Sequence, residues 1–579
     1  MTREIKAPKG RVIVPGSASG KLIVSQTPLS FMMGVDPVTG MIVDHHHPLQ
    51  GRIIKDQILA IPRGRGSCSG SGVILELLMQ GKGPAAFIFS KAEEILTLGV
   101  LVAKVLFEKS IPIIVLDEAV FATLSDGETA HISETALRLN SQQTHIELAP
   151  ATLPDPSGSS IAISDDEKEM LSGSYGEARK VSMEAIYHFA KLQGATSFIP
   201  VSGVHIDTCY YCGPSTLLFA ERLHSMGGKF AGPTTLNSIS VDRRRWRELG
   251  TDPAFGEAAS KVADLYVAMG AKPSFTCAPY LRNDKPKLGE QVGWAESNAV
   301  VFANSVLGAR TQKYPDFLDV FIGLTGRAPA AGCHLDEGRK PKVLIEVEHL
   351  AKVDDSFWPL LGHRVGEISE SDIPFISGIE HLKPTIADLK AFGAAFATTS
   401  SAPMFHIAGI TPEALQTVPL KQNLRNAKIA LSVLQKTHRQ LNSARDSSLG
   451  LISLGNPHFS PEEFRILSAL CEGRRRHPDV RVVVTTSRES YDMAEAAGHI
   501  DTITDYGAEV ITDTCWCFIT EPIIPVHVKN LMTTSGKYAH YGPGMVQRGV
   551  HFGSLADCID AACAGKREYY VPTWLHEQS

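Results

Sequence analysis

The chain has 579 residues, of which 43% are hydrophobic and 20% are charged, and its formal net charge is -6 at pH 7. This is the composition of an ordinary globular protein with room for more than one domain, and it excludes a largely disordered chain. The charge balance also argues against a nucleic-acid partner, since the arginine clusters at 243–245 and 474–476 are isolated and typical of solvated helix faces.

The sequence shows neither a signal peptide nor a membrane-spanning segment. The amino terminus lacks the apolar core of a signal peptide, and no uninterrupted apolar run approaches the roughly 18 residues that span a bilayer. We therefore expect a cytoplasmic protein without a membrane partner. In that compartment the ten cysteines, scattered from Cys68 to Cys563, are thiols or metal ligands rather than a disulfide framework.

The first 150 residues predict a compact α/β unit, because short apolar runs alternate there with helical patterns. The strand-like runs lie at 11–14, 58–61, 86–89 and 113–116, and the helical patterns lie at 72–80 and 93–108. Residues 150–160 are rich in Pro and Ser, which predicts a linker.

Beyond the linker, the chain predicts parallel sheet with crossover helices. Ser164 to Glu167 matches a capping box and opens one long predicted helix that runs to about residue 193. Strand-like runs follow, most of them succeeded by an amphipathic stretch, at 198–201, 343–347, 396–399, 451–454 and 480–485. Two similar βα units, near 375–420 and 450–510, indicate that this larger part has subdomains.

The segment from Gly293 to Arg310 reads as a helix whose apolar pattern is interrupted by polar side chains. Ser297 and Asn304 are seven residues apart and would share one face of a helix. Burying such groups costs a few kcal/mol unless each finds a partner. The partner is either a polar ligand in a cleft or, alternatively, another protein element across a polar seam. The interrupting residues are Glu296, Ser297, Asn298, Asn304, Ser305 and Arg310.

A Gly/Ser turn from Gly64 to Gly72 follows one predicted strand and opens a helix. Glycines let the backbone approach a ligand, and helix amides favour an anion such as a carboxylate. The turn matches neither a phosphate loop nor a Rossmann fingerprint. An ordinary structural turn is the alternative interpretation.

The cysteines offer three candidate sites. Cys209 and Cys212 have redox or metal spacing, but no second pair at zinc-finger distance accompanies them. Cys515 and Cys517 stand at a predicted strand-to-loop position. Single cysteines in Gly/Pro-rich loops, such as Cys277 and Cys333, suit an iron-sulfur cluster between subdomains. For each cysteine the alternative is a small buried hydrophobic side chain.

Two further motifs contain histidine. In 44–48 three consecutive histidines follow Asp44 and would point in different directions before Pro48, so this segment is a weak metal candidate. In 455–463 we expect Ser460 to cap a helix and Glu463 to complete its capping box, while Asn456 and His458 lie in the preceding loop, where α/β folds place binding groups.

Taken together, these motifs resemble those of aconitase X, a divergent branch of the aconitase superfamily. The resemblance covers nearly the whole chain and implies an aconitase-like α/β fold, with a small swivelling domain at 1–150 fused to a large catalytic domain at 160–579. The segments that carry it are 44–51, 64–72, 232–237, 293–310, 324–327, 456–458, 513–515 and 534–540.

The family has two main types, and the fusion of the two domains favours one of them. A fused bacterial enzyme dehydrates cis-3-hydroxy-L-proline, whereas a two-subunit archaeal enzyme dehydrates mevalonate 5-phosphate. The archaeal type is similar to this chain but carries Cys at the position of Asn456 and none at that of Cys333. The resemblance thus implies that one cluster ligand has been exchanged.

The implied activity is a hydro-lyase that converts cis-3-hydroxy-L-proline to Δ1-pyrroline-2-carboxylate with an iron-sulfur cluster of [2Fe-2S] or [4Fe-4S] type. Such an enzyme needs a base at C2, an acid at the 3-hydroxyl and an anchor for the carboxylate. The resemblance implies Ser67 as the base, with Ser71 as its competitor, and we expect Glu296 to take the substrate amine. It implies Cys277, Cys333 and Cys515 as cluster ligands. The expected substrate contacts are Gly66, His205, Thr235, Asn237, Asn298, Asn304, Arg310, Asn456, His458 and Lys537.

Three other functions stay open at this point. One is the mevalonate 5-phosphate reaction, for which no additional Arg/Lys cluster lies beside the motifs. Another is an aconitase-like ligand-binding protein without chemistry, and the third is a zinc or redox enzyme that uses Cys209 and Cys212. For the favoured reading the partner is a small hydroxy amino acid, and we expect a monomer.

Overall fold

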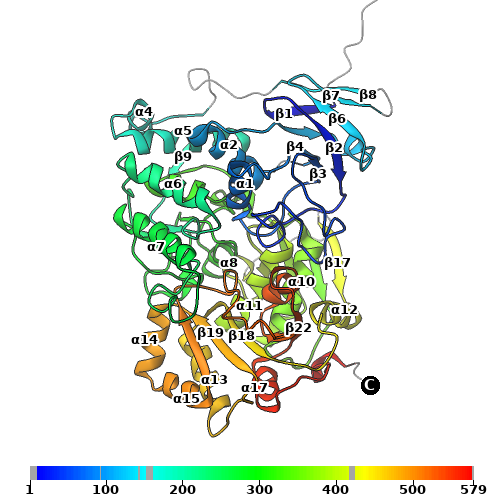
Figure 1. The fold of residues 1–579 in the computed structure, drawn as a ribbon, viewed down its shortest axis with the longest axis vertical. Coiled ribbons are helices and arrows are strands. Elements are labelled where there is room, and N and C mark those ends of the chain that lie inside the picture. The colour runs from blue at the N-terminus through cyan, green and yellow to red at the C-terminus, as the bar shows by residue number, and fades with distance from the viewer. Residues whose placement is uncertain (1–8, 92, 141–143, 151–160, 416–423, 577–579) are drawn as a thin grey trace, which may run out of the picture.

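A computed structural model describes residues 9–91, 93–140, 144–150, 161–415 and 424–576. Within these ranges the chain alternates strands and helices in five sheets, which confirms the predicted α/β class (Figure 1). Residues 151–160 of the predicted linker lie outside the described residues. None of the described helices is both long enough and apolar enough to cross a lipid bilayer.

The amino-terminal domain, hereafter the small domain, is built on an eight-stranded sheet of order β1-β5-β4-β3-β2-β6-β7-β8. Strands β2 to β5 run parallel, while β1 and the β6–β8 meander pair antiparallel. All four predicted strands and both predicted helices are confirmed. The elements are β1 (Gly10–Val14), β2 (Ala18–Val24), β3 (Ile58–Ala60), α1 (Gly70–Met79), β4 (Ala86–Phe89), α2 (Ile95–Phe107), β5 (Ile113–Leu116), α3 (Glu118–Phe121), β6 (Thr129–Ile132), β7 (Ala136–Leu139) and β8 (Thr144–Glu147).

The next part of the chain surrounds a three-stranded parallel sheet of order β11-β10-β12. The long helix predicted from Ser164 is instead two helices, because Gly173 and Gly176 adopt positive φ angles of 88° and 94° that end the first one. The elements are α4 (Asp165–Ser172), α5 (Glu177–Leu192), β9 (Phe198–Pro200), β10 (Val204–Ile206), α6 (Pro214–Ser225), β11 (Thr234–Leu236), α7 (Pro253–Ala268), β12 (Gly293–Trp294), α8 (Ser297–Phe302), η3 (Ala303–Leu307), α9 (Leu318–Thr325) and β13 (Arg327–Pro329).

A four-stranded parallel sheet of order β16-β15-β14-β17 comes third. The strand predicted at 396–399 is wrong, since these residues end helix α11, which Thr385 and Asp388 start with a capping box. The capped start and the apolar face buried against α10 outweigh the strand preference of the two threonines. The elements are β14 (Val343–Val347), α10 (Phe357–Ser369), β15 (Pro374–Ser377), α11 (Ile386–Thr399), β16 (His406–Ile407), β17 (Arg425–Ile429) and α12 (Leu431–Leu441).

The carboxyl-terminal part forms a five-stranded parallel sheet of order β20-β19-β18-β21-β22. The capping box predicted at Ser460 and Glu463 is confirmed at the start of α13. The elements are β18 (Leu451–Phe459), α13 (Pro461–Cys471), β19 (Arg481–Thr486), α14 (Arg488–Ala496), α15 (His499–Tyr506), β20 (Ala508–Thr512), β21 (Asn530–Thr533), α16 (Gly536–Met545), β22 (Gly549–Phe552) and α17 (Leu555–Ala564). Short 3-10 turns are η2 (Pro279–Leu281), η4 (Gly332–His334), η5 (Glu337–Arg339), η6 (Glu380–Leu382), η7 (Pro412–Ala414) and η9 (Thr573–Leu575).

The small domain lies against the rest of the molecule through helix α1, which packs on α6 (Figure 1). Glu76 of α1 is buried and accepts hydrogen bonds from the backbone N–H of Ser215, at 2.9 Å, and from its hydroxyl, at 2.5 Å. A carboxylate at the first turn of α6 satisfies N–H groups that no helical carbonyl can reach. This contact holds the start of α1, and the turn before it, over the large domain.

Candidate active site

The first group of site residues lies at the carboxyl edge of the β11-β10-β12 sheet. Asp207 follows β10, Asn237 follows β11, and Glu296 lies two residues after β12. Because β10 is central, with β11 on one side and β12 on the other, the strand order reverses there. Ligands of open α/β sheets bind at such reversals, outside the carboxyl ends of the strands. The edge therefore presents two acids and an amide to one cavity.

The second group comes from the corresponding edge of the five-stranded sheet. Its order reverses at β18, where Asn456 lies at the point at which pairing with β19 loses register. Cys515 and Cys517 follow β20, and Lys537 lies in the first turn of α16, after β21. The reversal of strand order in this second sheet therefore places an amide, two thiols and an ammonium group at the cavity.

The small domain closes this space with the turn that precedes α1. Ser67 Oγ donates a hydrogen bond to Ser69 Oγ at 3.2 Å, and Ser69 Oγ donates to Asp207 Oδ2 at 3.1 Å. A chain of hydroxyls thus runs from the cavity to a buried carboxylate across the two domains. The cavity holds only about 20 Å³ of free space. Its walls are Met32, Met33, Ser67, Ser69, Asp207, Asn237, Ser238, Cys277, Glu296, Asn298, Asn456, Cys515, Cys517, Phe518 and Lys537.

Three cysteine sulfurs share one wall of the cavity. Hydrogen bonding to Cys277 raises the pKa of the Cys515 thiol to about 12, and hydrogen bonding to Cys515 raises that of Cys517. The amide of Asn456 donates to Cys517 Sγ at 3.8 Å, and the backbone N–H of His458 donates to Cys277 Sγ at 3.3 Å. A bound cation reverses such pKa shifts and keeps thiols as thiolates. The sulfurs are thus placed to serve as metal ligands.

The donors on this wall of the cavity are soft sulfur atoms. In the described ranges, no group of three or more His, Cys, Asp or Glu side chains that could hold a metal ion is found. Thiolates that hold an iron-sulfur cluster bind different iron atoms, so they need not converge on one point, and soft sulfur donors select iron-sulfur clusters. Cys277, Cys515 and Cys517 therefore fit the implied cofactor.

A buried ion pair lies beside the thiols. Lys537 Nζ is 3.5 Å from Glu296 Oε1, and both side chains are less than a tenth exposed. Burial alone would lower the pKa of the Lys537 ammonium, but the negative charges of Cys517 and Glu296 outweigh it and raise the pKa. Glu296 also caps α8 through the N–H of Ala299 at 2.8 Å. The sequence indicated that Glu296 is an isolated acid within a helix that needs a cation from the substrate. In the structure it lies at the start of α8, and Lys537 of the same chain is its cation.

Asp207 belongs to a cluster of three buried acids. Burial, with the nearby charges of Glu296 and Asp319, raises its pKa to about 7. Asp319 accepts hydrogen bonds from the backbone of Asp207 and from Thr208, and Asp316 is the third buried acid of the cluster. Burial and the charge of Asp207 raise the pKa of Asp316 as well. Asp207 is consequently able to take up a proton near neutral pH.

Several of the expected substrate contacts and catalytic groups do meet at the cavity. Asn237 donates to Asp207, and Asn298 donates to Glu296 and to the carbonyl of Cys277. The structure thus brings together seven of the expected residues in addition to the thiols of Cys277 and Cys515, with Gly66 directly adjoining the turn. The seven are Ser67, Asn237, Glu296, Asn298, Asn456, Lys537 and, through its backbone contact with Cys277, His458.

Other expected residues lie behind the walls. Ser71 donates to the carbonyl of Ile95 at 2.7 Å inside α1, so its hydroxyl faces α2 and not the cavity. His205 bonds Thr235 at 2.8 Å and the carbonyl of Thr276 at 3.0 Å, and burial lowers its pKa to about 3. Ser71 thus links α1 to α2, and His205 with Thr235 links β10 to β11, so none of the three lines the cavity.

The carboxyl-terminal half of the polar segment also faces away. Helix α8 ends at Phe302 and a π-helical turn follows. Ser297 and Asn304, which are seven residues apart, therefore do not belong to one regular α-helix as expected. Asn304 bonds Thr311 and the carbonyl of Pro403, and Arg310 pairs with Asp336. Asn304 and Arg310 thus find their partners in other elements of the protein, as the alternative of a polar seam between packed elements predicted.

Cys333, expected as a cluster ligand, lies away from the other two expected thiols. It is buried with Ile373 and Met404, and its thiol lies 3.5 Å from the carbonyl of Gly338. It does not line the cavity with Cys277 and Cys515, whereas Cys517 does. Cys209, buried in the core with its thiol toward the carbonyl of Asn237, is likewise outside.

Sequence reasoning missed Asp207 and Ser69. The signal for Asp207 was its position directly after Val204–Ile206, a short apolar run before a loop, and Ser69 lies in the Gly/Ser turn already noted. Neither could be paired without the fold, because the two residues are 138 positions apart.

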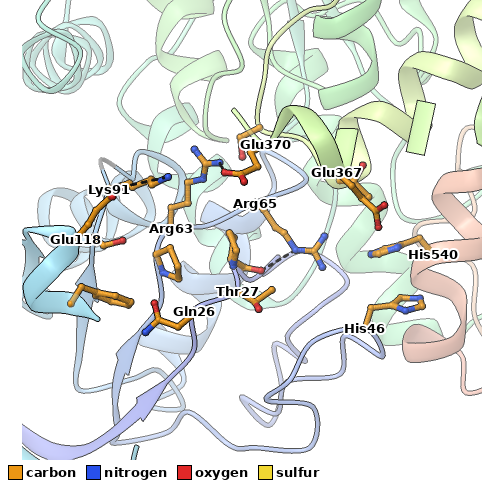
Figure 2. Close-up of a pocket in the computed structure, with 16 residues that line it drawn as sticks. Gln26, Thr27, His46, Arg63, Arg65, Lys91, Glu118, Glu367, Glu370 and His540 are labelled. Carbon is orange, nitrogen blue, oxygen red and sulfur yellow. Dashed lines mark hydrogen bonds and ion pairs between the residues drawn. The ribbon is translucent and has the colours of Figure 1, made fainter. Parts of the chain in front are cut away.

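A larger cavity of about 680 Å³ lies between the small domain and helices α10 and α16 (Figure 2). It contains no thiol, and most of its charged groups pair within the protein, as Arg65 does with Asp44 at 2.6 Å. Of the three histidines in 44–48, His46 lines this cavity, and its ring stacks on that of His540 at 4.7 Å. This second cavity is therefore distinct from the thiol site.

Comparison with known proteins covers almost the whole chain. Four family profiles match, described as the aconitase X swivel domain (residues 7–140), first domain (160–337), second domain (341–440) and third domain (449–564). The chain is 51% identical to a cis-3-hydroxy-L-proline dehydratase of Hypocrea jecorina over 98% of this chain and 97% of that one. It is 49% identical to the enzyme of the same name from Pseudomonas aeruginosa, over 98% of each chain.

More distant relatives match only part of the chain. The phosphomevalonate dehydratase large subunit of Methanocaldococcus jannaschii is 30% identical over 69% of this chain and 99% of its own. Among solved structures, Thermococcus kodakaraensis aconitase X in its holo-form has a TM-score of 0.63 and 29% identity, covering 69% of this chain and all of that one.

Replacing Asp207 with Asn tests the cost of its burial. A carboxyl group whose pKa is higher in the folded than in the unfolded chain loses stabilising effect as pH rises from about 4 to about 7. We therefore expect Asp207→Asn to have a higher thermal unfolding midpoint than the parent at pH 8, and the difference to vanish near pH 4. Asp319→Asn is the matched control, and it should be less stable at pH 8 because it disrupts the hydrogen bonds at Thr208. Equal midpoints for parent and Asp207→Asn at pH 8 would contradict the argument.

Proposed function

The chain belongs to the aconitase X family, and on this premise we propose that it is a hydro-lyase that dehydrates cis-3-hydroxy-L-proline. The proposal is supported above all by the Lys537–Glu296 pair in an enclosed cavity. A proline-type substrate carries one carboxylate and one ammonium, so a single cation next to a single acid matches it. Identity of about half to two dehydratases named for this substrate supports the same choice.

The cavity is less suited to a phosphorylated substrate. Lys537 is the only cationic side chain among the residues that line it. A phosphate group needs several cationic or amide donors to offset its charge on leaving water. Mevalonate 5-phosphate is therefore the weaker alternative.

When the zwitterionic substrate binds, it would separate Lys537 from Glu296, and each of the two side chains would pair with one charged group of the substrate. Lys537 receives the carboxylate and Glu296 receives the ammonium, so each buried charge exchanges one partner for another and none is left unpaired. Asn298, which bonds Glu296, and Asn237, which bonds Asp207, hold the two carboxylates in position. The substrate is thereby oriented with its C2 and C3 atoms between the thiols and the serine turn.

The base at C2 is Ser67 in this proposal. A serine hydroxyl is too weak a base unless its own proton can leave, and the hydrogen bonds already point in the required direction, from Ser67 to Ser69 and from Ser69 to Asp207. Asp207 accepts the proton as Ser67 takes the one at C2. An ionised Asp207 is required for this step, so its raised pKa places the transition near pH 7.

An iron-sulfur cluster held by Cys277, Cys515 and Cys517 would supply a Lewis acid for the departing 3-hydroxyl. The backbone N–H of His458 and the amide of Asn456 stabilise negative charge on the sulfurs of Cys277 and Cys517. Met32, Met33 and Phe518 exclude water from the same space. The enamine product then tautomerises to Δ1-pyrroline-2-carboxylate.

We extend the proposal to the organisation and location of the protein. Residues 1–150 would swivel as one domain against 160–579, which is supported by two hydrophobic cores whose buried members all lie between Val12 and Leu148. The ten unpaired cysteines support a reducing cytoplasm.

The substrate assignment is tested by assaying anaerobically reconstituted protein with the isomers of 3- and 4-hydroxyproline and with mevalonate 5-phosphate. We expect kcat/KM for cis-3-hydroxy-L-proline to exceed that for every other compound by at least about a hundredfold, equal to roughly 2.7 kcal/mol of transition-state stabilisation. Efficient dehydration of the phosphate compound, without turnover of the hydroxyproline, would place the chain in the other branch.

The ligand assignment is tested by single Cys→Ser changes. Cys277→Ser, Cys515→Ser and Cys517→Ser should each lose the visible absorbance of the reconstituted protein together with its activity. Cys333→Ser serves as the control and should keep both, since that thiol packs against Ile373 and Met404. Persistent absorbance in Cys517→Ser, or its loss in Cys333→Ser, would restore the ligand set expected from the sequence.

The base is tested by comparing Ser67→Ala with Ser71→Ala. The first should lower kcat by about three orders of magnitude while the cluster absorbance persists. The second should have a modest effect, because the Ser71 hydroxyl bonds the backbone carbonyls of Cys68 and Ile95 and does not line the cavity. The parent's activity should rise with pH through about 7, and Ser69→Ala should weaken this dependence by cutting the link to Asp207. Exchange of the C2 proton at the parent's rate in Ser67→Ala would refute the role.

A further inference from the structure

The thiol cavity, as it stands, is too small for its proposed substrate. Its free space of about 20 Å³ accommodates roughly one water molecule, whereas ligand sites usually measure about 300–1,000 Å³. The second cavity, with about 680 Å³, falls within that range. A substrate-sized molecule can therefore occupy the second cavity in the observed arrangement, whereas the first must open to admit it.

The two cavities share two structural elements. The segment 63–67 gives Arg63 and Arg65 to the second cavity and Ser67 to the first, and helix α16 gives His540 to the second and Lys537 to the first. Between them Tyr541 Oη lies 3.4 Å from Ser30 Oγ. Gly66, at φ 78°, fits against this contact because a Cβ there would lie 2.7 Å from Tyr541 Oη. The cavities are thus neighbours separated by a thin wall.

Arg63 lines the second cavity and forms a single ion pair within the described chain. Its side chain is 11% exposed, and the pair is a long contact of 3.8 Å with Glu370, whose own side chain is 64% exposed. No hydrogen bond from its guanidinium is found among the described residues, although the group carries five N–H donors. The guanidinium therefore has N–H groups free to bind an anion that enters the cavity.

A second polar group in the same cavity lacks a partner. His540 is buried, and its Nε2 forms no hydrogen bond, while its Nδ1 lies 3.1 Å from His363 Nε2. Figure 2 shows Arg63 directed toward Glu370 and the His540 ring near Arg65 and His46. On the small-domain side of the cavity, Lys91 pairs with Glu118 and Arg65 pairs with Asp44. On the opposite side, Glu367 lies in α10 and Glu370 directly follows it. Arg63 is therefore the cation of the small domain whose ion pair reaches across the cavity, to Glu370.

We propose that this second cavity is an outer binding site for a small zwitterionic amino acid, with its carboxylate on Arg63 and its ammonium on Glu370. The Arg63–Glu370 pair at 3.8 Å repeats the chemistry of the Lys537–Glu296 pair at 3.5 Å, so one molecule complements both sites. The choice of a proline-type amino acid rests on the proposed function. The site would hold either the substrate before it enters or an unreactive amino acid of the same shape.

Calorimetric titration with L-proline tests the outer site, because L-proline has no hydroxyl group to eliminate. We expect a binding event that survives Lys537→Met and disappears in Arg63→Gln, with affinity reduced at least tenfold. Arg465→Gln is the matched control, since Arg465 forms a surface pair with Glu462 far from both cavities in the sequence and is largely exposed. It should bind L-proline as the parent does. An event that survives Arg63→Gln but disappears in Lys537→Met would overturn the proposal.

Two analogues test the zwitterion requirement. Cyclopentanecarboxylate lacks the amine and pyrrolidine lacks the carboxylate, so each should bind the outer site at least tenfold more weakly than L-proline. Equal binding of cyclopentanecarboxylate would reduce the site to a simple anion site and refute the claim. With cis-3-hydroxy-L-proline as ligand in Ser67→Ala, a second Arg63-dependent event would identify the substrate as an occupant, and its absence, with L-proline still bound, would identify an unreactive amino acid.

These measurements separate the outer site from the proposed reaction. Binding of L-proline that depends on Arg63 would establish the outer site even if the parent protein failed to dehydrate cis-3-hydroxy-L-proline. Conversely, turnover without any Arg63-dependent binding would leave the reaction in place and remove the outer site. Thermal midpoints of Arg63→Gln and Arg465→Gln within about 2 °C of the parent would show that both variants are folded.

Discussion

The site depends on one geometric constraint, which is that parallel strands bring their carboxyl ends to the same edge of a sheet. In two sheets of this protein the strand order reverses at the central strand, at β10 and at β18. Each reversal opens a crevice, and the loops after the neighbouring strands carry the reactive side chains into it. Asp207 and Glu296 come from one edge and Cys515 and Lys537 from the other, so the chemistry arises where the two edges share a cavity.

Closing that cavity imposes an energetic cost that the polar contacts offset. Asp207, Glu296 and Lys537 are all buried, and a buried charge without a partner destabilises the fold by several kcal/mol. Glu296 is therefore bonded by Lys537, Asn298 and the N–H of Ala299, and Asp207 by Asn237 and Ser69. Asp316 is also buried, and burial with the neighbouring charge of Asp207 raises the pKa of its carboxyl group. Groups that a zwitterion could engage are thus kept satisfied while the cavity is closed.

The sequence predicted local features well and long-range pairings poorly. The capping box of Ser460 and Glu463, the small-domain strands and the serine turn were readable, because each is encoded within about ten residues. The helix break at Gly173 and Gly176 and the helical state of 396–399 depended on backbone angles and on packing against α10. Cys333 was expected beside Cys277 because the two flank the polar segment in the sequence, whereas in the structure Cys517 is the third thiol that lines the cavity. The family resemblance, in contrast, was confirmed over nearly the whole chain.

The hydrogen-bonded hydroxyls join two parts of the chain that are far apart in the sequence. Ser67 and Ser69 lie in the turn before α1 and Asp207 follows β10, so the path from the cavity to the buried carboxylate exists only while this turn lies over β10. Moving the turn away would leave Ser69 without Asp207 as its acceptor and would expose the Lys537–Glu296 ion pair to water. Glu76, which bonds Ser215 at the start of α6, helps to hold α1 and the turn in this place. In the mechanism that we propose, the proton acceptor and the barrier to water depend on the same contact, so we expect the C2 proton to be removed only while that contact is made.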